Sequence, residues 1–210
     1  MKRFDIIVNL KNSSALYMPC MIKPCKFDEV REQFIDESKP FCRTSWLCFE
    51  FKFLPPAFFN HILAWYIKQY SVSVITEKGT RNERKALYRQ IGVFNLDSSG
   101  CEQLVVCEGP NVIALQVWSS RMLYRTYGDF GENLLRFIDT ISDRYRLKIT
   151  YEKTFKCNDG DFTIYRKRID DLQTKEYRCL EHRINHGSED LVNPWGFSAL
   201  TQNTTSDEDT

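Results

Sequence analysis

The sequence contains no glycine-rich phosphate loop and no long run of apolar residues, and only three of its 210 residues are histidines. Lys78-Gly79-Thr80 resembles the end of a phosphate loop, but the earlier glycine that lets backbone amides approach a phosphate is missing. The dinucleotide-binding pattern Gly-x-Gly-x-x-Gly is also absent. We therefore expect no nucleotide site.

The missing apolar runs also bear on the compartment. No segment reaches the ~18 apolar residues of a membrane span, and Ile6-Ile7-Val8 is too short for a signal-peptide core. The expected location is the cytoplasm, where the eight cysteines would be free thiols. Disulfides, which an even number of cysteines allows, are the alternative. A net charge of +1 gives no reason to expect nucleic acid or an anionic membrane as partner.

Catalytic motifs are equally scarce. Asp129-Phe130-Gly131 matches the letters of a kinase metal-binding element, but the other loops that a kinase needs are absent. We interpret Gly128-Asp129 as the cap of a helix that begins near Gly131. A hydrolase needs a base beside its nucleophile, and we expect His61 at the surface of a helix. The chain is therefore not expected to be an enzyme.

Residue patterning predicts an α+β fold, an antiparallel sheet with flanking helices. Residues 46–53 alternate as a strand, with Phe49, Phe51 and Phe53 on one face, and the prolines at 55–56 end it. The other predicted elements are a helical turn at 28–35, helices at 58–70 and 128–145, and strands at 86–94, 102–107, 112–118 and 147–155.

The predicted helix at 58–70 is apolar over about half of its circumference, which is more than one contact with a sheet requires. We expect part of it to cover the sheet and the rest to bind a partner. Trp65 is the favoured exposed residue, because tryptophan is enriched among interface anchors. The predicted interface consists of Phe58, Trp65, Tyr66 and Ile67.

Residues 156–197 are polar and contain two of the three histidines. Cys157, Cys179, His182 and His186 have residue types and spacings that fit four ligands of one zinc ion. A structural metal would help this segment to fold, because it has few core residues. The alternative is a set of free thiols beside two solvated histidines, since the paired cysteines of a zinc ribbon are missing from the first half.

Several runs, in this order, resemble the C-terminal-of-Roc (COR) domain of Roco proteins. Residues 3–7 and 16–22 resemble the exit from the winged-helix part of that domain. Residues 47–63 resemble the strand, Leu-Pro elbow and long helix of its second subdomain, and residues 86–94, 112–117 and 133–138 fit later strands and a helix. The resemblance covers residues 1–155.

The resemblance implies a non-catalytic scaffold module that contacts a Roc-type GTPase domain and takes part in dimerisation during signalling. The chain departs from the pattern in having no GTPase or kinase motifs and only the end of the winged helix. The alternatives are an independent protein-interaction adaptor or a zinc-dependent enzyme that uses the Cys/His segment. The expected organisation is a winged-helix end at 1–24, a COR-type domain at 25–155, a Cys/His appendage at 156–197 and a disordered acidic tail at 198–210.

Overall fold

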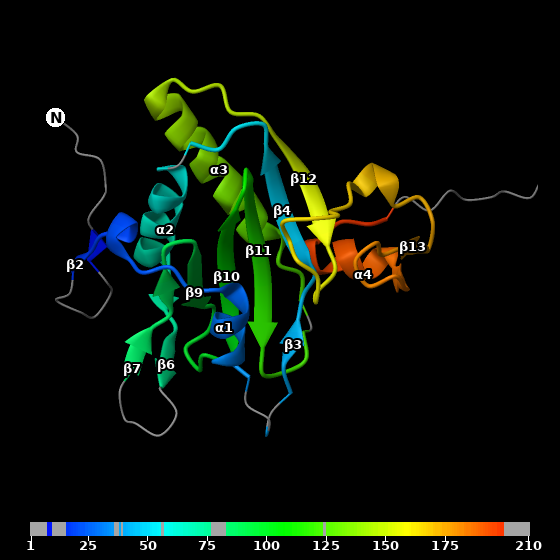
Figure 1. Cartoon of the computed structure of the whole chain (residues 1–210), viewed down its shortest axis with the longest axis horizontal. Helices are drawn as coiled ribbons and strands as arrows, with labels where there is room; N and C mark the ends of the chain where they lie inside the picture. Colours follow the sequence, from blue (N-terminus) through cyan, green and yellow to red (C-terminus); the bar gives the residue numbers. More distant parts are fainter. Residues whose placement is uncertain are drawn as a thin grey trace, which may run out of the picture.

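The computed structural model describes residues 8–9, 16–35, 38, 40–55, 57–76, 83–123 and 125–199. The described chain is a mixed α+β fold built on one large antiparallel sheet (Figure 1), which confirms the predicted fold class. Most of the expected tail, residues 200–210, and residues 1–7 and 10–15 of the expected winged-helix end lie outside the described residues. What is described of residues 1–24 is a two-stranded sheet, β1 (Val8–Asn9) with β2 (Leu16–Tyr17), and the short helix η1 (Pro19–Met21).

The main sheet has eight strands, and its central order is β12-β4-β11-β10-β9-β5, with β3 beside β11 and β8 beside β9. A tight turn joins β10 to β11: Gly109 pairs with Val112, and Asn111 adopts a left-handed backbone with φ of 53°. Asparagine tolerates this conformation better than most residues. The strands are β3 (Cys42–Arg43), β4 (Trp46–Phe51), β5 (Ser71–Val72), β8 (Leu87–Tyr88), β9 (Ile91–Asn95), β10 (Glu102–Gly109), β11 (Val112–Ser119) and β12 (Tyr151–Lys156).

Both faces of this sheet are covered (Figure 1). Helices α2 (Phe58–Gln69) and α3 (Gly128–Tyr145) pack on one face, and α1 (Phe27–Glu32) packs on the other. In β4, Leu47 and Phe49 join the first core, while Trp46 and Cys48 join the second. The strand ends at Phe51, so Phe53 is not part of it and is 66% exposed. The prediction that Phe53 lies on the same strand face as Phe49 and Phe51 was therefore wrong.

Helix α3 has the predicted bounds, but its beginning differs from the prediction. It starts at Gly128 rather than near Gly131, and no side chain caps it at Tyr127. Asp129 instead lies in the first turn, where its negative charge is favourable near the helix N-terminus. No helix in the described part of the chain is long and apolar enough to cross a membrane.

The wide apolar arc of α2 is largely covered by this chain itself. The helix packs against β1, η1, α3, β5 and β9 as well as filling the core. Phe58, Tyr66 and Ile67 are buried, which corrects the interface prediction for these three side chains. Trp65 is half-buried and stacks on Phe137 of α3 with ring centroids 4.9 Å apart. Of the four predicted interface residues, Trp65 alone keeps exposed surface.

The C-terminal segment packs on the sheet beside β4 and β12 (Figure 1). It comprises η2 (Ile169–Asp171), a hairpin of β13 (Glu176–Arg178) and β14 (Asn185–Gly187), α4 (Ser188–Val192) and η3 (Asn193–Trp195). Leu172, Leu191 and Trp195 belong to the same hydrophobic cluster as α2 and α3. The hydrophobic cluster is therefore continuous across residue 156. A further hairpin, β6 (Val74–Thr76) with β7 (Glu83–Lys85), lies next to β5 in the chain.

Candidate metal centre

The structure brings together all four residues that the sequence predicted as metal ligands. One side-chain atom from each of Cys157, Cys179, His182 and His186 lies within 4.8 Å of the others. The two Sγ atoms are 3.9 Å apart, each Sγ is 3.6 Å from Nδ1 of His182, and that nitrogen is 3.3 Å from Nε2 of His186.

These separations match a tetrahedral site. A zinc ion binds sulfur at about 2.3 Å and nitrogen at about 2.0–2.1 Å. Tetrahedral angles then place two sulfurs about 3.8 Å apart, sulfur and nitrogen about 3.5 Å apart, and two nitrogens about 3.3 Å apart. Four of the six distances among these atoms follow this order and lie close to these values, and the two from the cysteine sulfurs to His186 are within 4.8 Å. The Cys/His group could therefore hold a metal ion.

Local backbone structure positions the ligands. Cys157 directly follows β12, and Cys179 directly follows β13. The chain then turns back, with hydrogen bonds from Arg183 N to Cys179 O (2.8 Å) and from Cys179 N to Ile184 O (2.9 Å). Arg183 takes a left-handed backbone conformation in this turn, with φ of 60°. The turn brings His182 back beside Cys179, and β14 carries His186 to the same place.

An ion pair beside the ligands links β12 to this turn. Lys156, which precedes Cys157, pairs with Glu181, which precedes His182, and Lys156 is only 2% exposed. The backbone N–H of Asp161 also donates to the Glu181 carboxylate at 3.2 Å. Burial alone would raise the pKa of Glu181, but these hydrogen bonds hold it below its ordinary value. The pair therefore fixes the two ligand-bearing segments relative to each other.

The Cys157 thiol is protonated in the metal-free chain. Burial, followed by the proximity of Cys179, raises the pKa of Cys157 to about 11. Because only a thiolate is a good metal ligand, an incoming ion has to displace this proton. All eight cysteines of the chain are free, and none forms a disulfide.

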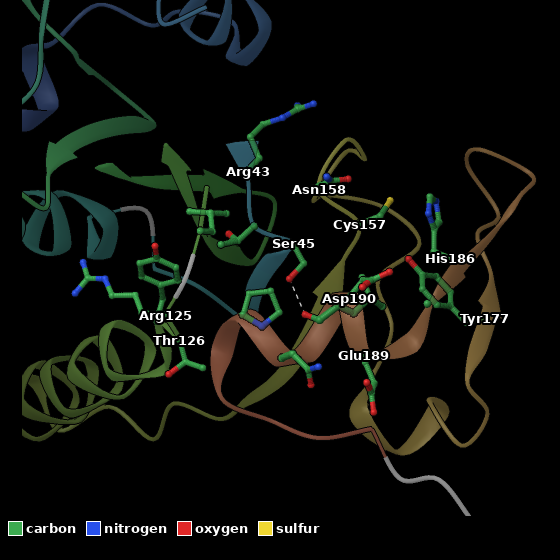
Figure 2. Close-up of a pocket in the computed structure, with 17 residues that line it drawn as sticks. Arg43, Ser45, Arg125, Thr126, Cys157, Asn158, Tyr177, His186, Glu189 and Asp190 are labelled. Carbon is green, nitrogen blue, oxygen red and sulfur yellow. Dashed lines mark hydrogen bonds between the residues drawn. The ribbon is translucent and has the colours of Figure 1, made fainter. Parts of the chain in front are cut away.

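A cavity of about 610 Å³ adjoins the centre. Figure 2 shows Cys157, Tyr177 and His186 along one side of it and Arg125 on the opposite side. Both arginines at this cavity have counterions: Arg43 pairs with Asp159 at 2.6 Å, and Arg125 pairs with Glu102 at 2.8 Å. The cavity therefore has no uncompensated positive charge with which to attract an anion.

The third histidine is far from this centre in the chain and in the fold. His61 lies half-buried on α2, where its Nε2 is 3.3 Å from the hydroxyl of Tyr145. The ligand set thus contains two of the three histidines, as predicted from their spacing. Sequence reasoning missed Lys156, Tyr177 and Glu181. The only sequence signal for the ion pair is that Lys156 and Glu181 each directly precede a predicted ligand, and no pattern in the sequence distinguishes Tyr177.

No protein-family model matches the sequence, and no curated protein matches it either.

Proposed function

We propose that this chain is a non-catalytic scaffold module whose C-terminal segment is held on the sheet by a structural zinc ion. The observation that carries the metal part is the clustering of two sulfurs and two nitrogens in the Cys/His group, with four of their six distances close to those of a tetrahedral site. A mixed sulfur and imidazole set with four protein ligands is typical of structural zinc, whereas catalytic zinc keeps one position open for water or substrate.

The scaffold part depends on the resemblance of residues 1–155 to the COR domain, which implies self-association and contact with a Roc-type GTPase domain. The half-exposed pair of Trp65 and Phe137, which bridges α2 and α3, supports a protein-binding surface there. Tryptophan contributes strongly to protein interfaces because it offers a large, rigid contact area. With neither a phosphate loop nor a base beside a nucleophile in the sequence, we propose no GTP or ATP binding.

A zinc-dependent enzyme is the second candidate, because Cys157 and His186 border a cavity large enough for a small molecule. The filled ligand set weighs against it, since no coordination position remains for a substrate. An independent adaptor that binds through the same aromatic surface would use the same residues with a different partner.

Metal analysis tests the zinc proposal. The purified chain should carry one zinc per molecule, and Cys179→Ser should lose it. Cys101→Ser is the matched control, because Cys101 is a half-buried cysteine in the turn between β9 and β10 and should leave the zinc content unchanged. A wild-type chain that folds without metal and takes up no added zinc would refute this part.

Light scattering tests the scaffold proposal. Trp65→Glu should weaken self-association, or the binding of a Roc-type GTPase domain, with little change in melting temperature. Met122→Glu removes another exposed apolar side chain, at 64% exposure, and should behave like the wild type. Unchanged association in Trp65→Glu would exclude this surface, and stoichiometric GTP or ATP binding by calorimetry would overturn the non-catalytic assignment.

A further inference from the structure

Tyr177 is a buried tyrosine whose hydroxyl lacks a hydrogen-bond partner among the described residues. The residue is only 9% exposed, and its hydroxyl oxygen is cut off from solvent. Tyr177 lies on β13 directly opposite His186 on β14, and the two rings are 5.7 Å apart at an angle of 34°. Buried hydroxyls nearly always have a partner, so this one calls for an explanation.

The candidate acceptor for the Tyr177 hydroxyl is the Cys157 thiol. Burial raises the pKa of Tyr177 well above its ordinary value, and the next causes are the neighbouring Cys157 and Cys179, with a side-chain contact to Cys157 that falls short of a full hydrogen bond. Tyr177, Cys157 and His186 also line the same cavity (Figure 2). The phenol is therefore beside the sulfur of a ligand and against the ring of another.

The state of the sulfur decides whether the hydroxyl has an acceptor. A neutral thiol is a weak acceptor, whereas a metal-bound thiolate carries negative charge and accepts hydrogen bonds more strongly. A metal-bound Cys157 would therefore offer the buried Tyr177 hydroxyl the strong acceptor that it lacks.

We propose that Tyr177 is a positioning residue of the metal centre, which donates its hydroxyl hydrogen to the Cys157 thiolate and packs its ring against His186 when zinc is bound. This inference rests on the proposed zinc site. Hydrogen bonds to ligands fix their orientation and tune the metal, and their loss typically weakens metal binding by about 10–100-fold.

Tyr177→Phe tests the hydroxyl, because it keeps the ring that packs on His186. Competition with a chromophoric chelator should show zinc bound about 10–100-fold more weakly than in the wild type, still at one ion per chain. With Co²⁺ in place of zinc, the sulfur-to-cobalt charge-transfer band should move to longer wavelength, since a thiolate without its hydrogen bond is a stronger electron donor. A purely structural role would not move this band.

Two variants serve as controls. Tyr165→Phe changes a tyrosine that is 57% exposed in the same segment and should alter neither the affinity nor the band. Asp190→Asn tests the other charged neighbour of the Tyr177 hydroxyl. An unchanged cobalt band in Asp190→Asn supports Cys157 as the acceptor, whereas a band that responds to Asp190→Asn and not to Tyr177→Phe overturns the proposal.

The outcomes separate this proposal from the zinc site itself. If the wild-type chain binds neither Zn²⁺ nor Co²⁺, both the zinc site and the role of Tyr177 are refuted. A wild-type chain that binds one ion, with Tyr177→Phe identical in affinity and spectrum, removes only the role of Tyr177. If Tyr177→Phe does not fold, uniform fluorotyrosine labelling of the native sequence makes the hydroxyl a stronger donor and should move the cobalt band to shorter wavelength; an unmoved band then refutes the proposal.

Discussion

The indole N–H of Trp195 donates to Ser45, with Nε1 3.0 Å from Oγ and 3.2 Å from the carbonyl oxygen of that residue. Ser45 immediately precedes β4, and its own hydroxyl donates to the carbonyl of Leu191 at 2.6 Å. A further bond runs from the backbone N–H of Tyr127 to the carbonyl of Pro194 at 2.7 Å. The segment that contains three of the four candidate ligands is thus fastened to Ser45 and Tyr127, which are distant from it in sequence.

Metal removal should consequently destabilise the whole fold rather than free one segment. An ion that binds only the folded chain adds about 4 kcal/mol to the free energy of unfolding when its concentration is 1,000 times its Kd. We expect a single thermal transition that moves to lower temperature with added chelator, together with faster proteolysis of both 46–155 and 156–197. Two separate transitions, with the sheet unaffected, would contradict this.

Trp195 should contribute more to stability than any exposed residue of the same segment. It is 1% exposed, so Trp195→Ala leaves a large cavity and should lower the free energy of unfolding by about 3–5 kcal/mol. Trp195→Phe keeps much of the volume but loses the hydrogen bonds to Ser45, and should cost less. Leu180→Ala, at an exposed position, should change stability by less than about 0.5 kcal/mol. Urea denaturation of the metal-loaded variants measures these differences.

The strongly periodic elements could be predicted from the sequence because local patterning determines them. The helix at 128–145 has one apolar stripe and charged residues elsewhere, and α3 has these bounds. The strands at 102–107 and 112–118 are separated by turn residues, and β10 and β11 pair across that turn. The proximity of Cys179, His182 and His186 was predictable for a similar reason, since their spacing reflects the short turn between β13 and β14.

The features that could not be predicted from the sequence depend on contacts between distant parts of the chain. The apolar arc of α2 suggested a protein partner, but β1, η1 and α3 of this chain cover most of it. Local sequence patterning cannot predict which distant elements will pack on a helix. Trp195 gave no periodic signal because it stands in a short helix, and its partner Ser45 is 150 residues away. The role proposed for the Tyr177 hydroxyl could not be predicted from the sequence either, because only the folded β13–β14 hairpin brings Tyr177 near Cys157.

Gly128 should resist substitution although alanine usually favours a helix. A Cβ atom at this position would collide with the carbonyl oxygen of Trp195, which is backbone and cannot rotate away. A Cβ at Gly131 would instead meet the end of the flexible Leu47 side chain at 2.6 Å. Replacing glycine by alanine inside a helix otherwise gains about 0.5–1 kcal/mol. We expect Gly128→Ala to lower the melting temperature clearly more than Gly131→Ala; the reverse order would show that η3 is free to move.

Glu108 should make stability depend on pH in the direction opposite to an ion-paired carboxylate. Burial raises its pKa to about 7, although a hydrogen bond with Gln90 lowers it in part. An unfolded glutamate titrates near pH ~4.3. Between these values the folded chain holds a proton that the unfolded chain has lost, so the free energy of unfolding falls as pH rises through this window. Below it the stabilising contribution of the protonated form is complete, and above pH 7 it is gone. Glu108→Gln stays neutral at every pH and should therefore exceed the wild type in stability at pH 8 but match it at pH 4.

Differences between paired proteins isolate this effect, because every other titrating group contributes equally to both. Urea denaturation of wild type and Glu108→Gln at matched pH and zinc concentration should give a stability difference that grows from pH 5 to pH 7 and then levels off. Glu83→Gln, at an exposed position on β7, should give a difference that stays nearly constant. Parallel pH profiles for Glu108→Gln and the wild type would mean that the Glu108 carboxyl is solvated and ionised in the folded chain, and that its burial at the end of β10 does not penalise its charge.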